Sequence, residues 1–156
     1  MRNNSTILSI LHTKFSNNLV SRNFNLIKIN NEIRWVIEND SSTLSVLEEW
    51  RPYNKIKNFF WKILIILQSS RLINLLPICN NKQLKISEEF LNFNKKLDFR
   101  KTSIVCFLAR AAHINQKAII FLINKEKQEC SYIIKKAISQ RSWESLQNEY
   151  LVLKNL

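Results

Sequence analysis

Hydrophobic and polar positions alternate in short blocks over the last third of the chain. The apolar runs Ser103–Leu108, Lys117–Ile123 and Cys130–Ile138 are rich in β-branched and aromatic residues, and polar connections separate them. Runs of this length and composition are typical of β-strands. The pattern therefore predicts a three-stranded antiparallel meander.

A helical pattern follows the third run. Its apolar residues recur at spacings of three and four, which places them on one helix face: Trp143, Leu146, Tyr150 and Leu153. Glu149 shares this stripe, so we expect its carboxylate to point at the sheet, where it is costly unless it is paired. Strands followed by a helix predict an α+β fold.

The first half of the chain predicts a small β unit. Apolar residues alternate with polar ones on both sides of Asn30-Asn31, which predicts two short strands joined by a turn. Asparagine adopts the left-handed backbone conformation more readily than most residues, so this pair can form the turn without glycine. Residues 1–22 are polar, and we expect them to be frayed or to form a short helix.

Residues 53–76 carry the most regular helical pattern of the chain. Six apolar residues recur there at three and four, and Pro77 ends the pattern: Ile56, Phe59, Phe60, Ile63, Leu64 and Leu67. We expect this amphipathic helix to pack its apolar face on the domain, with its lysines in water. Residues 79–85 predict a polar linker, and Glu88–Phe99 predicts one more short helix.

These patterns divide the chain into three segments. Residues 1–50 form a leader that contains β-structure, residues 51–101 form a basic helical segment, and residues 102–156 form the meander and its helix. We expect the three segments to fold as one compact unit.

Composition narrows the possible chemistry. The 156 residues include no glycine, whereas average usage would give about eleven. Glycine-based phosphate loops of the dinucleotide and Walker types are therefore excluded.

The formal net charge is +12, and most of it lies in residues 51–101. Such charge suits nucleic acid, phosphate or an anionic membrane, but no nucleic-acid recognition motif accompanies it.

The cysteine pattern and the hydropathy predict the cellular compartment of the protein. Cys79, Cys106 and Cys130 are odd in number and form no Cys-x-x-Cys pair, so we expect a reducing environment and no zinc site. The longest apolar stretch, Phe59–Leu67, contains Lys62 and is much shorter than the roughly twenty residues that cross a bilayer. The amino end lacks a signal-peptide pattern. We expect a soluble, cytoplasmic protein.

Two charged positions in the meander and its helix suggest a chemical role. The third run contains Lys135 and Lys136, and Glu149 follows on the predicted helix. A strand lysine can neutralise phosphate oxygens, and a helix carboxylate can fix its rotamer and keep it cationic. The ordinary alternative is a solvated lysine pair on an edge strand and a surface carboxylate.

At these residues the chain resembles the amino-terminal lobe of the aminoglycoside-phosphotransferase-like branch of the kinase fold. Gln116–Asn124 is similar to the second strand of that branch, Ser131–Ile138 to its lysine strand, and Asn148–Leu153 to the helix with its glutamate. The upstream Arg34-Trp35 and Trp50-Arg51-Pro52 resemble the leader of bacterial relatives. The resemblance covers about the last third of the chain, and its motifs are short.

The resemblance implies ATP as cofactor, with Lys135 and Glu149 orienting its phosphates. Lys135 is favoured over Lys136 because the family's lysine usually follows two apolar residues directly. Two features depart from the family. The connection Ala109–Gln116 has no glycine where the family has a glycine-bearing lid, so Arg110 and His113 would contact phosphate only through their side chains.

The second departure concerns catalysis. No His-x-Asp loop follows the strands, and Asp98-Phe99-Arg100 precedes them, so this triplet is out of order for metal binding. We expect a truncated, split or degenerate nucleotide-binding lobe of a kinase-like small-molecule phosphotransferase. It would bind ATP through Lys135, Glu149 and Arg110, with no catalytic or metal-binding residues of its own, and a separate carboxy-terminal lobe or chain would complete it.

The alternative is a non-catalytic interaction module. In this interpretation the basic helix at 53–76 docks on an acidic partner or makes peripheral contact with an anionic membrane surface. The substrate and the oligomeric state have no signal in the sequence.

Overall fold

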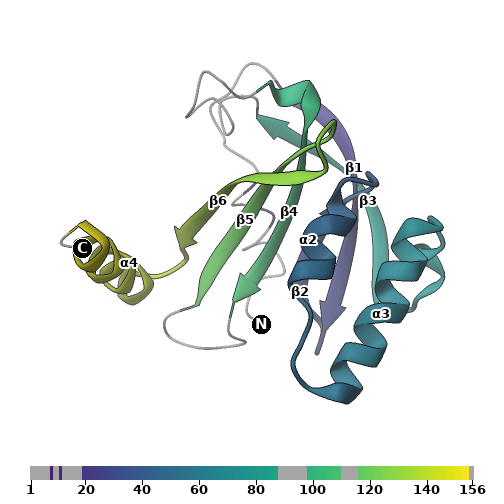
Figure 1. Ribbon diagram of the computed structural model, residues 1–156, viewed down its shortest axis with the longest axis horizontal. Coiled ribbons are helices and arrows are strands. Elements are labelled where there is room, and N and C mark those ends of the chain that lie inside the picture. Colours follow the sequence, from purple (N-terminus) through teal and green to yellow (C-terminus); the bar gives the residue numbers. More distant parts are fainter. Residues whose placement is uncertain (1–7, 9–10, 12–18, 88–97, 110–115, 155–156) are drawn as a thin grey trace.

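The computed structural model describes residues 8, 11, 19–87, 98–109 and 116–154. Their strands form one antiparallel sheet of six strands in the order β3-β1-β2-β4-β5-β6 (Figure 1). The strands are β1 (Leu19–Ile29), β2 (Glu32–Glu38), β3 (Cys79–Ser87), β4 (Thr102–Ala109), β5 (Lys117–Asn124) and β6 (Glu129–Ala137). The α-helices are α2 (Thr43–Glu49), α3 (Lys55–Ser69) and α4 (Gln140–Lys154), and the 3-10 turns are η1 (Ile73–Leu75) and η3 (Phe99–Lys101).

The predicted meander and its helix are present. β4 pairs with β5, and β5 pairs with β6, in antiparallel register, and α4 follows β6 directly. The α+β class, the antiparallel meander and the carboxy-terminal helix are therefore confirmed. All three sequence segments contribute strands to the sheet.

The predicted amino-terminal strand pair is also confirmed. β1 and β2 are antiparallel neighbours, and the turn between them places Asn30 at φ 52° and Asn31 at φ 62°. Two further positive-φ positions carry Arg71, which follows α3, and Gln128, which lies in the β5–β6 turn. Residues other than glycine thus form these left-handed turns. The conformational free-energy cost of a positive φ is smaller for asparagine than for most other residues.

The polar linker predicted at 79–85 is wrong, because these residues belong to β3. β3 pairs with β1 along its whole length, and β1 begins at Leu19, inside the segment expected to be frayed or helical. β3 lies at the edge of the sheet, where exposed Asn and Lys side chains are tolerated on its open side. Its apolar positions are few, with Leu84 half-buried and Ile86 buried, so its composition resembles that of a loop.

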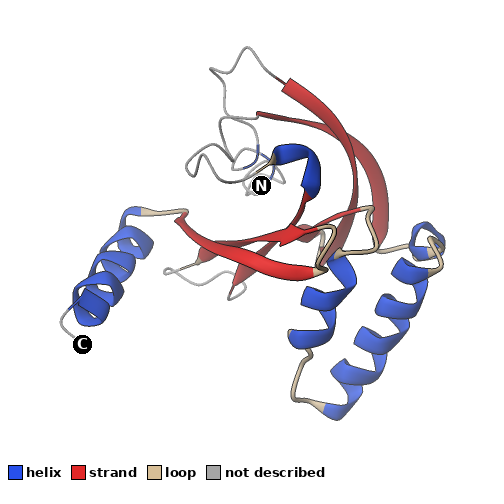
Figure 2. Cartoon of the chain, turned by 45° about the horizontal axis from the view of Figure 1, so that its top comes forward, coloured by secondary structure: helices blue, strands red, loops and turns tan. Residues whose placement is uncertain are grey.

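Helices α2 and α3 lie side by side on one face of the sheet (Figure 2). They cover a cluster that includes Val105, Phe107 and Phe121, and they contribute Val46, Leu47, Leu64 and Ile65 to it. Asn54 caps the first turn of α3, because its side-chain oxygen accepts hydrogen bonds from the backbone N–H groups of Ile56 and Lys57 at 3.1 and 3.2 Å.

Only part of the predicted apolar face of α3 meets the sheet. Leu64 of that face is buried together with Ile65 and Gln68, whereas Ile56, Phe59 and Phe60 are exposed. A buried hydrogen bond, from Asn25 Nδ2 to Gln68 Oε1 at 2.8 Å, helps to fix this orientation. Asn25 on β1 therefore favours burial of the face of α3 that carries Gln68, and the apolar pattern alone does not indicate this face.

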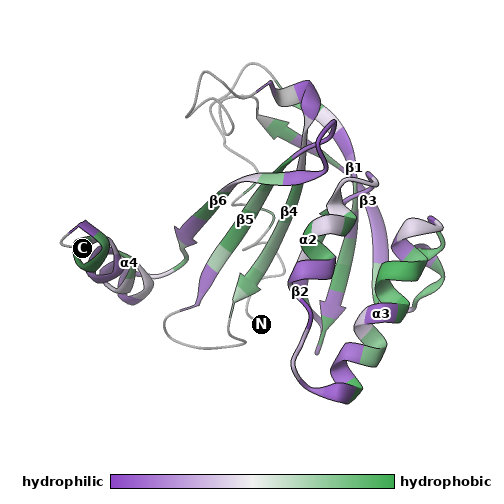
Figure 3. Cartoon of the chain, in the orientation of Figure 1, coloured by the Kyte–Doolittle hydropathy of each residue, from purple (hydrophilic) through white to green (hydrophobic). Residues whose placement is uncertain are grey.

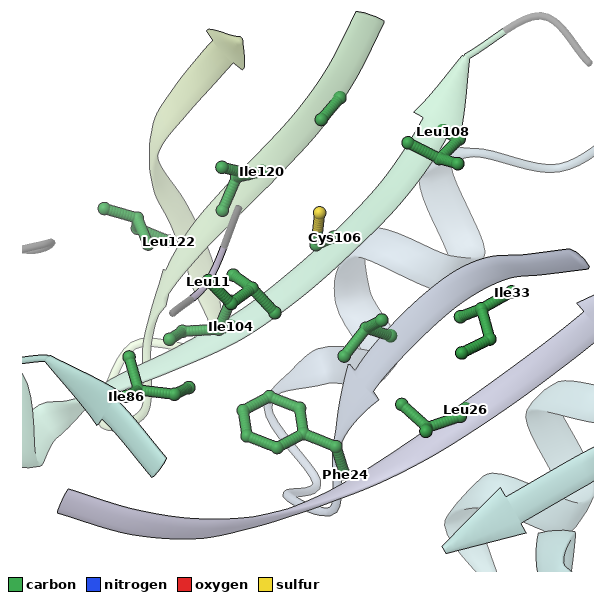
Figure 4. Packing of buried hydrophobic residues seen from close by; sticks show 12 residues of the cluster. Leu11, Phe24, Leu26, Ile33, Ile86, Ile104, Cys106, Leu108, Ile120 and Leu122 are labelled. Atoms are coloured by element: carbon green, nitrogen blue, oxygen red, sulfur yellow. The ribbon is translucent and has the colours of Figure 1, made fainter. Parts of the chain in front are cut away.

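The opposite face of the sheet carries a second apolar cluster. Figure 4 shows side chains from strands β1 to β5 converging there, among them Phe24, Ile104 and Ile120, all fully buried. Leu11 packs into the same cluster. The short helix predicted at Glu88–Phe99 falls mostly on residues 88–97, which lie outside the described residues.

No helix in the described part of the chain has the length and apolar character needed to cross a bilayer.

Candidate functional site

Helix α4 begins at the end of β6 and lies beyond that edge of the sheet, away from α2 and α3 (Figures 1 and 2). Two serines fix the junction between β6 and α4. Ser142 Oγ accepts hydrogen bonds from the backbone N–H groups of Ile138 and Ser139 at 2.9 and 2.8 Å, and Ser142 N–H donates to Ser139 Oγ at 3.2 Å. This reciprocal capping orients the first turn of α4 relative to β6.

Glu149 on α4 contacts two lysines of the sheet. Lys135 Nζ on β6 lies 3.0 Å from Glu149 Oε2, and Lys117 Nζ on β5 contacts Glu149 Oε1. Lys117 also donates a hydrogen bond to Ser145 Oγ at 3.0 Å, one turn before Glu149 on α4. The structure thus brings Lys135 and Glu149 together and adds Lys117 to them.

The register of β5 and β6 explains which lysine reaches Glu149. Lys135 lies opposite Ile119, which packs in the cluster beneath α2 and α3, and Lys117 is two residues from Ile119 on that face. Lys136 lies opposite Ala118, a residue of the other cluster. The two adjacent lysines therefore project from opposite faces of the sheet.

The three charged groups differ in their exposure to water. The side chain of Lys117 is 13% exposed, whereas those of Glu149 and Lys135 are 42% and 50% exposed. Hydrogen bonds from Lys117 and then Lys135 lower the pKa of the Glu149 carboxyl below its ordinary value. Glu149 is therefore a carboxylate at neutral pH, and it holds the half-exposed Lys135 ammonium in one position.

An open groove of about 900 Å³ runs beside this cluster. Its lining combines positive, negative, polar and apolar side chains: Lys135, Arg141, Glu144, Ser145, Asn148, Glu149, Val152 and Leu153. An ammonium group carries three hydrogen-bond donors, and Glu149 accepts one of those of Lys135, so the others face water or a ligand. The groove therefore contains a half-exposed cation whose position is fixed by a carboxylate.

The apolar stripe predicted on α4 is not packed on the sheet. Leu146 is half-buried, but Trp143, Tyr150 and Leu153 are all more than half exposed. Within the stripe it is Glu149 that reaches the sheet, because Lys117 and Lys135 draw it there. Arg110 and His113, the predicted phosphate donors of the β4–β5 connection, lie outside the described residues.

The sequence reasoning assigned no role to Lys117. The pairing of β5 with β6 indicates its role, because Lys117 is the first residue of β5 and lies on the face of the sheet that also carries Lys135. That relationship becomes visible only when the register between the two strands is known. A lysine at the first position of an apolar run is otherwise an ordinary strand terminus.

A second carboxylate between two cations lies inside the sheet. Arg22 Nη1 donates to both oxygens of Glu38 at 3.0 and 2.9 Å, and the Ile104 N–H donates to Glu38 Oε2 at 2.9 Å. Lys125 Nζ lies 3.5 Å from Glu38 Oε1. Burial raises the pKa of Glu38, and the attraction of Arg22 and Lys125 offsets part of that effect. This cluster ties β1, β2 and β4 together.

The tryptophans of the leader segment pack on the sheet. Trp35 on β2 stacks on Phe107 with ring centroids 4.5 Å apart, and Trp50 lies against Phe107 and Phe121 at 5.2 and 5.1 Å. These contacts give Trp35 and Trp50 a structural role, and Trp50, at the end of α2, stays 42% exposed.

The described residues contain no group of three or more His, Cys, Asp or Glu side chains that could hold a metal ion. Cys79, Cys106 and Cys130 are free thiols. Burial raises the pKa of each of the three, and most strongly that of Cys106, which is fully enclosed. These cysteines are protonated at neutral pH and are poor nucleophiles.

Comparisons of the chain with models of protein families, with curated proteins and with solved structures found no match.

Proposed function

We propose that this protein is a nucleotide-binding lobe of the kinase-like type, in which Lys135, held by Glu149, binds the phosphates of ATP. The observation that carries the proposal is the 3.0 Å contact between Lys135 Nζ and Glu149 Oε2. A strand lysine paired with a helix glutamate is the arrangement by which kinases orient nucleotide phosphates.

The geometry around this contact supports a binding role over a purely structural one. Lys135 is half exposed at the groove, and an exposed ion pair contributes little to stability. Lys117 is the more buried partner, so it can hold Glu149 in place while Lys135 meets a ligand. The pair therefore contributes orientation, which is what phosphate binding needs.

Phosphoryl transfer would require groups that this sequence does not supply. In the proposal, a carboxy-terminal lobe or a separate chain contributes the catalytic base and the magnesium ligands. The chain described here would then bind ATP without hydrolysing it.

The test is ATP binding by the purified chain, measured by isothermal titration calorimetry with magnesium present. We expect Lys135→Ala to weaken binding about tenfold or more, because a hydrogen bond to a charged group contributes about 1.5–3 kcal/mol. Lys136→Ala is the matched control, since it removes the same charge from the adjacent residue on the other face of the sheet.

Lys136→Ala should change the affinity less than about twofold, which is within the effect of net charge alone. Equal losses in the two variants would indicate non-specific attraction of ATP to a basic protein. An unchanged affinity in Lys135→Ala would remove Lys135 from the site.

A further inference from the structure

Helix α3 carries two apolar stripes, and one of them faces solvent. Trp61, Leu64, Ile65 and Gln68 form the stripe that meets the sheet and α2. The outward stripe recurs at three, four and seven residues on the opposite side of the helix, and it is strongly exposed: Ile56 70%, Phe59 62%, Phe60 64% and Ile66 63%. Figure 3 shows hydrophobic residues, in green, interspersed with hydrophilic ones, in purple, along α3.

Basic residues border this outward stripe. At 3.6 residues per turn, Lys55 and Lys62 flank one side of the stripe, and both are exposed. Lys57 is exposed as well, but it lies on the side of Trp61 and Leu64. The sequence from Arg51 to Ser87 contains seven lysines and arginines and no aspartate or glutamate. The exposed apolar surface therefore lies in the most positive part of the chain.

Charge decides among the partners that could cover this stripe. A second copy would bring two such basic segments together, and like charges in contact are destabilising. An anionic lipid surface satisfies both features, because it attracts the lysines and accepts apolar side chains below the headgroups. Lysine stems are also long enough to keep their ammonium groups at the headgroups while the stripe inserts.

We propose that α3 is a membrane-docking helix that lies parallel to the surface of an anionic bilayer. Ile56, Phe59, Phe60 and Ile66 enter the boundary between headgroups and acyl chains, and Lys55 and Lys62 contact acidic headgroups. The 15 residues of α3 give a helix about 22 Å long. The sheet stays in water, because the opposite side of α3 holds it.

This proposal is independent of nucleotide binding. Lys135 and Glu149 lie at the other end of the sheet, on β6 and α4 (Figure 1). A failure of ATP binding would not affect the membrane proposal, and a failure of membrane binding would not affect the nucleotide proposal. The Lys135→Ala variant should accordingly bind lipid as the parent chain does.

The first test is co-sedimentation with vesicles of phosphatidylcholine alone or mixed with phosphatidylserine. The parent chain should bind only the mixed vesicles. The double substitution Phe59→Ser and Phe60→Ser should lower that partitioning at least about tenfold, because it removes two inserted rings. The matched control is Tyr150→Ser with Leu153→Ser on α4, whose side chains are equally exposed; it should bind as the parent does.

The second test separates position from net charge. Lys55→Glu with Lys62→Glu should abolish binding to the mixed vesicles, whereas Lys127→Glu with Lys154→Glu changes the net charge equally and should weaken binding only slightly. Raising the salt from about 0.1 M to about 1 M shortens the screening length from about 10 Å to about 3 Å and should release the chain from the vesicles.

Three results would overturn the proposal. The parent chain would fail to bind mixed vesicles, or it would bind phosphatidylcholine equally well. Alternatively, the lysine substitutions would abolish binding while the phenylalanine substitutions did not, which would indicate a soluble acidic partner instead of a bilayer. All four double variants change exposed side chains, so circular dichroism should show the parent fold in each.

Discussion

Two carboxylates in this molecule each lie between two cations, and their surroundings give them opposite properties. Glu38 is enclosed between strands, with its side chain 8% exposed and that of Arg22 9% exposed. Glu149 lies at the end of the sheet, and it shares a groove with the half-exposed Lys135. Burial raises the pKa of Glu38, whereas hydrogen bonds from Lys117 and Lys135 lower that of Glu149.

The difference shows how to distinguish a structural ion pair from one that can serve a ligand. The oxygens of Glu38 receive hydrogen bonds from Arg22 and Ile104, and Arg22 also donates to Thr102 O at 2.6 Å. These contacts occupy both oxygens of a carboxylate that is almost fully buried. At Glu149 the contacts leave Lys135 half exposed beside the groove, and the proposed phosphate would bind there.

The largest effect on stability is expected at Glu38. Glu38→Ala leaves the buried Arg22 without its carboxylate, and breaking a buried pair in this way costs about 3–5 kcal/mol in the free energy of unfolding. Urea denaturation measures the loss. Glu129→Ala, at an exposed position on β6, should cost less than about 0.5 kcal/mol. Similar losses in both variants would contradict the structural role of Glu38.

A smaller loss is expected where α3 docks on the sheet. Gln68→Met removes the buried amide that accepts from Asn25, and leaving a buried donor unpaired costs about 1–3 kcal/mol. Gln147→Met on α4 is the matched control, because Gln147 is exposed. Urea denaturation compares the two. If both variants are as stable as the parent, the Asn25–Gln68 bond does not orient α3.

The smallest effect on stability is expected at Glu149. The pKa of Glu149 is lowered in the folded state, so the unfolded state binds more protons as the pH falls. The ion pairs of Glu149 therefore stabilise the fold fully above the pKa of the unfolded state. This stabilisation is lost as the pH falls through the pKa of the folded state. Exposure limits the contribution to less than about 1 kcal/mol. The difference between the parent chain and Glu149→Gln, followed from about pH 7 to about pH 3, should therefore shrink towards acid. A constant difference would contradict the lowered pKa.

Much of the fold could be predicted because short runs of β-branched and aromatic residues indicate strands. β4 and β5 are continuous buried runs, β6 alternates between its two faces, and the Asn30-Asn31 turn marks the β1–β2 hairpin. β3 could not be recognised, because an edge strand with one open side needs few apolar residues. The helix α2 was also missed, since only Thr43, Val46 and Leu47 of its seven residues are buried, which is too short a pattern to predict a helix.

Periodicity located α3 but did not show which of its faces is buried. Two stripes satisfy the same spacing, and the choice between them depends on Asn25, which lies 43 residues before Gln68. The candidate site shows the same limit. The order of lysine strand and glutamate helix predicted Lys135 and Glu149, whereas Lys117 depends on the register of β5 against β6. Local patterns predict elements, and long-range pairing assigns their faces.

The most direct test of the central claim is a double-mutant cycle on ATP affinity with Lys135→Ala, Glu149→Gln and the two combined, measured by calorimetry. If Glu149 acts by positioning Lys135, the combined variant should bind ATP no more weakly than Lys135→Ala alone, because the two residues act as one unit. Losses that simply add, or a parent chain that binds no ATP, would contradict the proposal.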